Sequence, residues 1–144
     1  MVQNPPENMP RITPYLLYAD VERALDWLSN AFGFRERLRF PGPDGKLTHA
    51  EMESGDSLIM MGCPGPDYRN PKQLGQVTHH TYIYVDDVDQ HFEQAKKAGA
   101  TILESPEDQF YGDRRYGAED PEGHHWYFAQ HVRDVAPEDM KMPE

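Results

Sequence analysis

Hydrophobic and polar residues alternate at the start of two segments, residues 13–33 and 80–100, and apolar residues then recur every three or four positions. This change of period predicts a strand followed by an amphipathic helix in each segment. An aspartate lies between the two halves, Asp20 in the first segment and Asp87 in the second, where it can cap a helix N-terminus. Both segments end near a glycine, which suits a helix C-terminus. The two segments therefore share one strand–helix plan.

The segments belong to an internal repeat, because Tyr15 aligns with Tyr82 and Asp20 aligns with Asp87 when one is laid over the other. After each predicted helix, alternating runs separated by Gly- and Pro-rich turns indicate three further strands. In the first copy these strands are residues 34–40, 47–53 and 57–61. In the second copy they are residues 101–106, 113–119 and 124–131. The pattern therefore predicts an α+β fold made of two βαβββ modules.

The domain boundaries follow from the repeat. We place the first module at residues 11–62 and the second at residues 77–131. A Pro/Gly-rich linker, residues 63–76, joins them, and residues 132–144 form a tail. Because neither module can bury its own sheet face, we expect the two to pack side by side as a single domain over residues 1–144.

Four motifs in this arrangement resemble the vicinal-oxygen-chelate superfamily, which includes glyoxalase I, extradiol dioxygenases and the bleomycin- and fosfomycin-resistance proteins. The motifs are "YADVERALDWLSNAFGF", "HAEMESGDSLIMM", "YVDDVDQHFEQAKKAGA" and "YGDRRYGAEDPEGHHWYFAQHV". The last of them, with the tail "DVAPEDMK", is similar to the PhnB-like branch of that superfamily. The resemblance implies paired modules whose sheets curl into a concave, ligand-holding cup, and it implies a homodimer.

Metal-dependent members of this superfamily hold a metal ion with His and Glu side chains from four strands. Carried over by position, these ligands fall at Thr13, Met60, His80 and Tyr127. Only His80 is a good ligand, because hydroxyl and thioether groups bind such metals poorly and a phenol must first lose its proton. We therefore expect no metal or other cofactor. The alternative is one divalent ion, such as Ni, Mn, Fe or Zn, in a rearranged site that uses His49 and Glu51.

Period-two alternation puts every second side chain of a strand on the same face. If His80 faces the cup, the side chains that share this face are those of Thr13, Tyr15, Leu17, Tyr82, Tyr84, His125 and Tyr127. We assign these residues to a ligand-binding site, together with His49 and Met60, although tyrosines in strands are often only packed against neighbours. Arg114 either meets an anionic group of the ligand or pairs with an acidic neighbour.

Other catalytic signatures, such as G-x-S-x-G or a phosphate-binding glycine loop, do not occur in the sequence. We assign no catalytic residue, although His80 could act as an acid or base. The sequence thus predicts metal-independent binding of a small aromatic or amphipathic molecule, as in bleomycin-resistance proteins that sequester a drug. The alternative is a lyase, isomerase or dioxygenase of the glyoxalase type with a rearranged site around His80.

Charge and composition narrow the partners and the location. The net charge is −11, from 25 acidic against 14 basic residues, which argues against nucleic acid and favours a cationic aromatic ligand. Cys63 is the single cysteine, which fits a reducing cytoplasm. No segment has the pattern of a signal peptide or the length of a membrane span, so we expect a cytoplasmic protein with no membrane partner.

Overall fold

The computed structural model describes residues 2–144 and contains the two predicted modules. The first consists of β1 (Tyr15–Leu17), α1 (Val21–Phe32), β2 (Arg35–Pro41), β3 (Leu47–Ser54) and β4 (Ser57–Gly62). The second consists of β5 (Thr81–Tyr84), α3 (Val88–Lys97), β6 (Thr101–Asp108), β7 (Asp113–Glu119) and β8 (His125–His131). The linker contains a short helix that the sequence pattern did not predict, α2 (Pro71–Leu74), and the tail contains a 3-10 turn, η1 (Pro137–Asp139).

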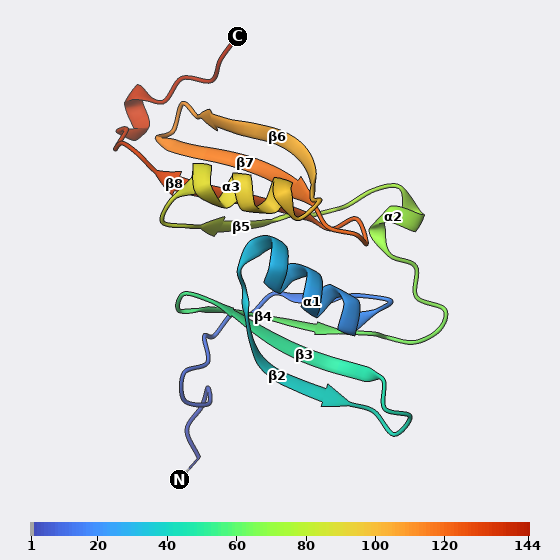
Figure 1. Ribbon diagram of the computed structural model, residues 1–144. Coiled ribbons are helices and arrows are strands. Elements are labelled where there is room, and N and C mark those ends of the chain that lie inside the picture. The colour runs from blue at the N-terminus through green and yellow to red at the C-terminus, as the bar shows by residue number, and fades with distance from the viewer. Residues whose placement is uncertain (1) are drawn as a thin grey trace.

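The strands form two four-stranded sheets of identical topology (Figure 1). The first sheet has the order β1-β4-β3-β2 and the second has the order β5-β8-β7-β6. In both, the opening strand of the module pairs in parallel with its last strand, and the remaining pairs are antiparallel. The predicted α+β fold of two βαβββ modules is confirmed. Each module forms a four-stranded sheet of its own.

Both long helices begin where the sequence predicts. The side chain of Asp20 accepts a hydrogen bond from the backbone N–H of Arg23 at 3.0 Å, and Asp87 accepts one from Gln90 at 3.1 Å. These bonds satisfy donors that the first helical turn leaves free. Gly33 ends α1 with φ of 74°, a conformation that glycine adopts without steric cost.

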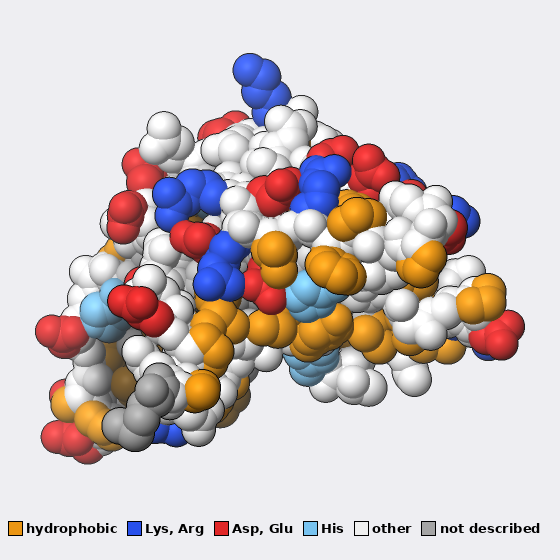
Figure 2. Space-filling view, turned by 90° about the horizontal axis from the view of Figure 1, so that it is seen from below, with side chains coloured by type: hydrophobic (Ala, Val, Ile, Leu, Met, Phe, Trp, Pro, Cys, Tyr) orange, Lys and Arg blue, Asp and Glu red, His pale blue; other side chains and the backbone are white. Residues whose placement is uncertain are grey.

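Each sheet has one face covered by its helix and one face that is open. The helix-facing side of the first sheet carries Ala50, Met52 and Met61, all fully buried. On the opposite side Tyr15 is 51% exposed and Phe40 is 61% exposed. In the view from below, toward the first sheet, hydrophobic side chains form a band with histidines beside it (Figure 2). Within residues 2–144, no helix combines the length and the apolar character needed to cross a membrane.

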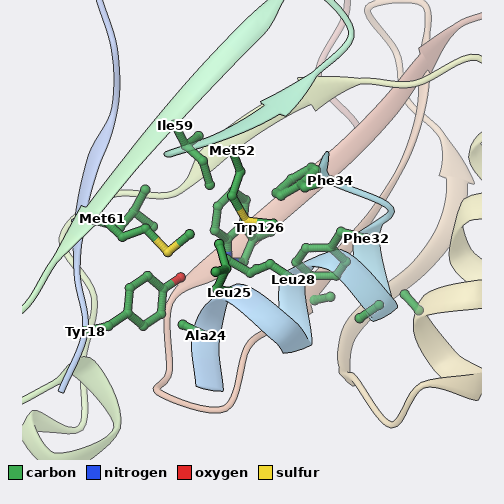
Figure 3. Close-up of a cluster of buried hydrophobic side chains, with 14 of the residues drawn as sticks. Tyr18, Ala24, Leu25, Leu28, Phe32, Phe34, Met52, Ile59, Met61 and Trp126 are labelled. Carbon is green, nitrogen blue, oxygen red and sulfur yellow. The ribbon is translucent and has the colours of Figure 1, made fainter. Parts of the chain in front are cut away.

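The covered faces of the two sheets share one hydrophobic core (Figure 3). Phe32, at the end of α1, contacts Phe128 and Trp126 of β8, with ring centroids 4.6 and 5.7 Å apart. Phe34 packs against the same two rings. A buried side chain of this size contributes about 1.5–3 kcal/mol to folding, so these contacts bind the modules to each other as well as to their own helices.

A buried polar cluster in the β7–β8 turn holds the end of β1. The hydroxyl of Tyr18 donates to Oδ2 of Asp120 at 2.6 Å, and Nε1 of Trp126 donates to the same oxygen at 3.0 Å. The carboxylate of Glu122 accepts from the backbone N–H of Ala19 at 2.7 Å. This turn of the second module therefore determines where the first strand of the first module ends.

Candidate functional site

The strand register defines which side chains share each open face. In the second sheet Tyr127 lies beside Tyr82 on one side and Gly117 on the other. The side chains on the open side of the second sheet form what we call the second open face: Tyr82, Tyr84, Asp113, Arg115, Glu119, His125, Tyr127 and His131. The corresponding side chains of the first sheet form what we call the first open face: Tyr15, Leu17, Arg37, His49, Glu51 and Met60.

A continuous chain of polar contacts crosses the first open face. The hydroxyl of Tyr15 lies 3.0 Å from Nδ1 of His49, and Nε2 of His49 lies 2.9 Å from Oε2 of Glu51. Arg37 donates a hydrogen bond to the other oxygen of Glu51. The Glu51 side chain is only 9% exposed, so this carboxylate is paired with a guanidinium and an imidazole inside the protein.

Tyr127 is the centre of the second open face. Its ring lies over Gly117, where an added Cβ would come within 2.6 Å of Cε1 of the ring. The ring of His80 lies 4.4 Å from the Tyr127 ring, centroid to centroid, and the guanidinium carbon of Arg115 lies 5.0 Å from the same centroid. Burial, and then the positive charge of Arg115, lower the pKa of His80. The result is an exposed-face aromatic ring with a guanidinium over it and an imidazole beside it.

At the other end of this face, three side chains donate to one buried carboxylate. Asp113 accepts from the hydroxyls of Tyr82 and Tyr84 at 2.7 and 2.8 Å, and its Oδ1 lies 2.8 Å from Nδ1 of His131. The opposite nitrogen of His131 lies 2.7 Å from Asp134 in the tail. Burial opposes ionisation of Asp113, but the hydrogen bonds from His131, Tyr82 and Tyr84 outweigh it and lower its pKa. The hydrogen bond to Asp113 in turn raises the pKa of His131.

The donor set does not fit a divalent metal ion. His80 is in contact with a tyrosine ring, and the methionine and threonine that accompany it in the predicted set are poor ligands. In the rearranged alternative, Glu51 already neutralises Arg37, so a metal would have to displace a guanidinium. Across residues 2–144, no three His, Cys, Asp or Glu side chains lie close enough to hold one ion.

The structure brings the predicted ligand residues together in two groups. On the second open face lie Tyr82, Tyr84, His125 and Tyr127, with His80 beside them. On the first open face lie Tyr15, Leu17, His49 and Met60. Thr13 precedes β1 and is half-buried. Among the described residues no strand of one sheet pairs with a strand of the other. Strand register therefore does not bring the two groups into one site.

Arg114 makes ion pairs, one of the two roles expected for it from the sequence. Its guanidinium donates to Asp89 of α3 and to Asp108, with distances of 3.1–3.2 Å, so the ion-pair alternative is the one that the structure shows. Alternation along β7 places the next residue, Arg115, on the open face instead. Sequence reasoning also missed Asp113 and His131, although both follow the same alternation as Tyr127.

A groove of about 680 Å³ lies where the modules meet, between the β3–β4 turn and β5. Apolar residues from both modules line it, among them Phe34, Met52, Ile59 and Ile83. Of the predicted ligand residues only Tyr82 and Tyr84 reach this groove. It is therefore a cleft between modules that reaches the second open face at Tyr82 and Tyr84, and Tyr127 does not line it.

These features describe a two-module α+β protein with aromatic, open sheet faces. The family model for the Glyoxalase/Bleomycin resistance protein/Dioxygenase superfamily matches residues 10–128. The chain belongs to that superfamily. The superfamily predicted from the sequence motifs is thus confirmed.

Relatives and solved structures agree with this assignment. Rv0887c of Mycobacterium tuberculosis is 39% identical over 132 residues, which cover 88% of this chain and 77% of that protein. The structure of TioX from Micromonospora sp. ML1 is 36% identical with a TM-score of 0.71, and the match covers 85% of this chain and 99% of TioX. The fosfomycin resistance protein FosX from Listeria monocytogenes shares the fold, with a TM-score of 0.63. It is 14% identical, and the match covers 92% of this chain and 98% of FosX.

Proposed function

We propose that this protein binds a small aromatic or amphipathic molecule on its open faces without a metal. The observation that carries the proposal is the Tyr127 ring, which lies over Gly117 on the open sheet face, with the guanidinium of Arg115 over the ring and the His80 ring beside it. Tyr15 and Tyr84 add rings that are 51% and 61% exposed. Such rings bind planar molecules by stacking and orient them through their hydroxyls.

Sequestration of a drug-like molecule is the role that fits this chemistry best. The alternative, a metal-dependent lyase, isomerase or dioxygenase, needs ligands that this chain supplies only at His80 among the four expected positions. A binding protein needs only shape, stacking and hydrogen bonds, which the open faces offer. Membership of the PhnB-like branch, a part in antibiotic resistance and a cytoplasmic location remain predictions from the sequence.

We further propose that the protein works as a homodimer in which the first open face of one copy lies opposite the second open face of its partner. The proposal is supported by the exposed rings on both faces and by the separation of the two faces into different sheets. Such a dimer would enclose a ligand between Tyr15 of one copy and Tyr127 of the other. Light scattering after size exclusion should give twice the mass of the 16.6 kDa chain; a monomer at all concentrations contradicts the arrangement.

Metal and ligand dependence can be separated by one set of measurements. Protein purified without chelator should contain well under one equivalent of divalent metal in elemental analysis. Its melting temperature should rise with polycyclic aromatic compounds and remain unchanged with Mn²⁺, Ni²⁺ or Fe²⁺. Stoichiometric metal, or stabilisation by one of these ions alone, would refute metal-independent binding and favour the enzyme.

The binding face can be tested with a matched pair of aromatic deletions. Tyr127→Leu should weaken binding of a stabilising aromatic compound by about tenfold, since stacking and ring burial together are worth about 1–2 kcal/mol. Phe92→Leu removes a half-buried ring from α3, on the covered side of the same sheet, and should leave the affinity unchanged. Equal losses in the two variants would mean that the ligand does not bind at the second open face.

A further inference from the structure

Arg115 has fewer hydrogen-bond partners than its position in the sheet would lead one to expect. Its Nη2 reaches Oε2 of Glu104 at 3.4 Å, a long hydrogen bond. Its Nε is, within residues 2–144, the one buried side-chain nitrogen or oxygen with no hydrogen-bond partner. The neighbouring Arg114, by contrast, donates to two aspartates. A guanidinium carries five N–H donors and the Arg115 side chain is 24% exposed, so its terminal N–H groups can bind oxygen atoms that the protein itself does not supply.

Three other donors lie on the same face, at Tyr127 or next to it along the strands. The guanidinium of Arg115 lies over the Tyr127 ring, and the ring of His80 lies on the same tyrosine. His125 is near enough for its charge, like that of Arg115, to lower the pKa of His80. In the part of the chain that the structure describes, the side chains of His80 and Tyr127 contact each other through their rings, and Nε2 of His125 is 4.0 Å from Glu119, beyond hydrogen-bond distance. We call these four side chains, Arg115, His80, His125 and Tyr127, the donor centre.

The acidic residues near the donor centre lie at its margins. Glu104 approaches Arg115 at 3.4 Å and is 47% exposed, and Glu119 lies 4.0 Å from Nε2 of His125. Neither carboxylate makes the bidentate contact that a paired arginine usually makes. Both are on the open face or its edge strand, so an incoming ligand can replace them without moving the core.

We propose that the donor centre binds an anionic oxygen group of the ligand, a carboxylate or a phenolate attached to an aromatic ring. The inference rests on the proposed function and names the chemical class of its ligand. The ring would stack at Tyr127, and the oxygens would accept from Arg115 and from the imidazoles. An oxyanion held this way receives charge-assisted hydrogen bonds, which are about twice as strong as neutral ones.

This ligand has the opposite charge to the one that the net charge of −11 suggests. The overall charge acts at long range and is screened over about 10 Å at ordinary salt concentrations. A guanidinium with unused donors acts at contact distance, where screening is small. The local donor set, and not the overall charge, therefore selects the group that binds here.

The test compares three probes of one shape and different charge: 2-naphthoate, 2-naphthalenemethanol and 2-naphthylmethylamine. Isothermal titration calorimetry of the full chain should show the naphthoate binding most tightly. Arg115→Gln should weaken naphthoate binding about tenfold or more, the cost of losing a charged hydrogen bond, and should change the affinity of the alcohol by less than about threefold. Arg114→Gln, which removes the neighbouring arginine from the covered side, should leave all three affinities unchanged.

The outcomes distinguish this inference from the proposed function. If the three probes bind with equal affinity, if the amine binds best, or if Arg114→Gln is as harmful as Arg115→Gln, the anionic-ligand assignment is overturned while aromatic binding stands. If none of the probes binds to wild-type protein and no other aromatic compound stabilises it, the proposed function fails as well. Arg115→Lys keeps the charge but lacks the planar set of donors, so it should lose part of the naphthoate affinity. An unchanged melting temperature of this variant would show that the loss is not due to misfolding.

Discussion

Asp120 offers the most direct test of how the two modules are joined. Asp120 is only 2% exposed, and its carboxylate accepts four hydrogen bonds. Two come from the side chains of Tyr18 and Trp126, and two come from backbone N–H groups of the β7–β8 turn. Asp120→Ala removes all four acceptor interactions and leaves the two side-chain donors buried without partners.

The expected loss follows from those two donors. Leaving a buried donor unsatisfied costs about 1–3 kcal/mol, so Tyr18 and Trp126 together imply a loss of about 2–6 kcal/mol. The lower end is already a large part of the 5–15 kcal/mol that usually separates folded from unfolded protein. Tyr18→Phe, which leaves Asp120 with three of its donors, should cost only about 1 kcal/mol.

Urea denaturation followed by circular dichroism measures these free energies of unfolding, provided that the slope with denaturant is unchanged. The double variant Tyr18→Phe/Asp120→Ala should cost less than the sum of the single variants, because one unsatisfied donor is then absent. Asp26→Ala removes an exposed aspartate of α1 and serves as the control. A loss below about 1 kcal/mol for Asp120→Ala, or strict additivity in the cycle, would refute this account of the turn.

Two further predictions concern the second open face. The raised pKa of His131 means that its contribution to stability is present at low pH and is lost as the pH rises through the folded-state pKa, above the ordinary 6.5. The lowered pKa of Asp113 limits the stabilisation at low pH, because the contribution of Asp113 to stability is present above its ordinary pKa of 3.8 and is lost as the pH falls. The difference in melting temperature between wild type and His131→Gln should therefore be largest between the ordinary pKa values of Asp113 and His131, and it should shrink as the pH rises beyond the raised pKa of His131; a difference independent of pH would contradict the ion pair. Gly117→Ala should cost about 1–3 kcal/mol by displacing the Tyr127 ring, and the cost should largely vanish in a Tyr127→Ala background when both are measured by urea denaturation; an equal cost in both backgrounds would place the strain elsewhere.

Local patterns in the sequence predicted the elements and their orientation. Period-two alternation assigned His125 and Tyr127 to one face of their strand, and the residues that alternate with them, Trp126 and Phe128, are fully buried on the other. The caps at Asp20 and Asp87 and the end of α1 at Gly33 were predicted from residue type alone. These properties depend on a few consecutive residues, because strand and helix periods are set by the geometry of the chain itself.

The contacts that define the candidate site could not be read in this way. Alternation within the sequence did not single out Arg115, since a shift of one residue moves a side chain to the other face of the sheet. The pairing of β7 with β8 decides it by placing Gly117 beside Tyr127. Likewise, the shared acceptor Asp113 joins Tyr82, which lies far from it in sequence, to the start of β7.

The sequence by itself thus determined the repeat, the superfamily and the side chains that alternate onto one face of each strand, because all of these are local or repeated patterns. Tertiary structure decided which strand lies beside which, that the open faces belong to two separate sheets, and that Arg115 retains unused donors. Whether a buried donor has an acceptor depends on residues distant in the chain, and only packing brings those residues within hydrogen-bond distance.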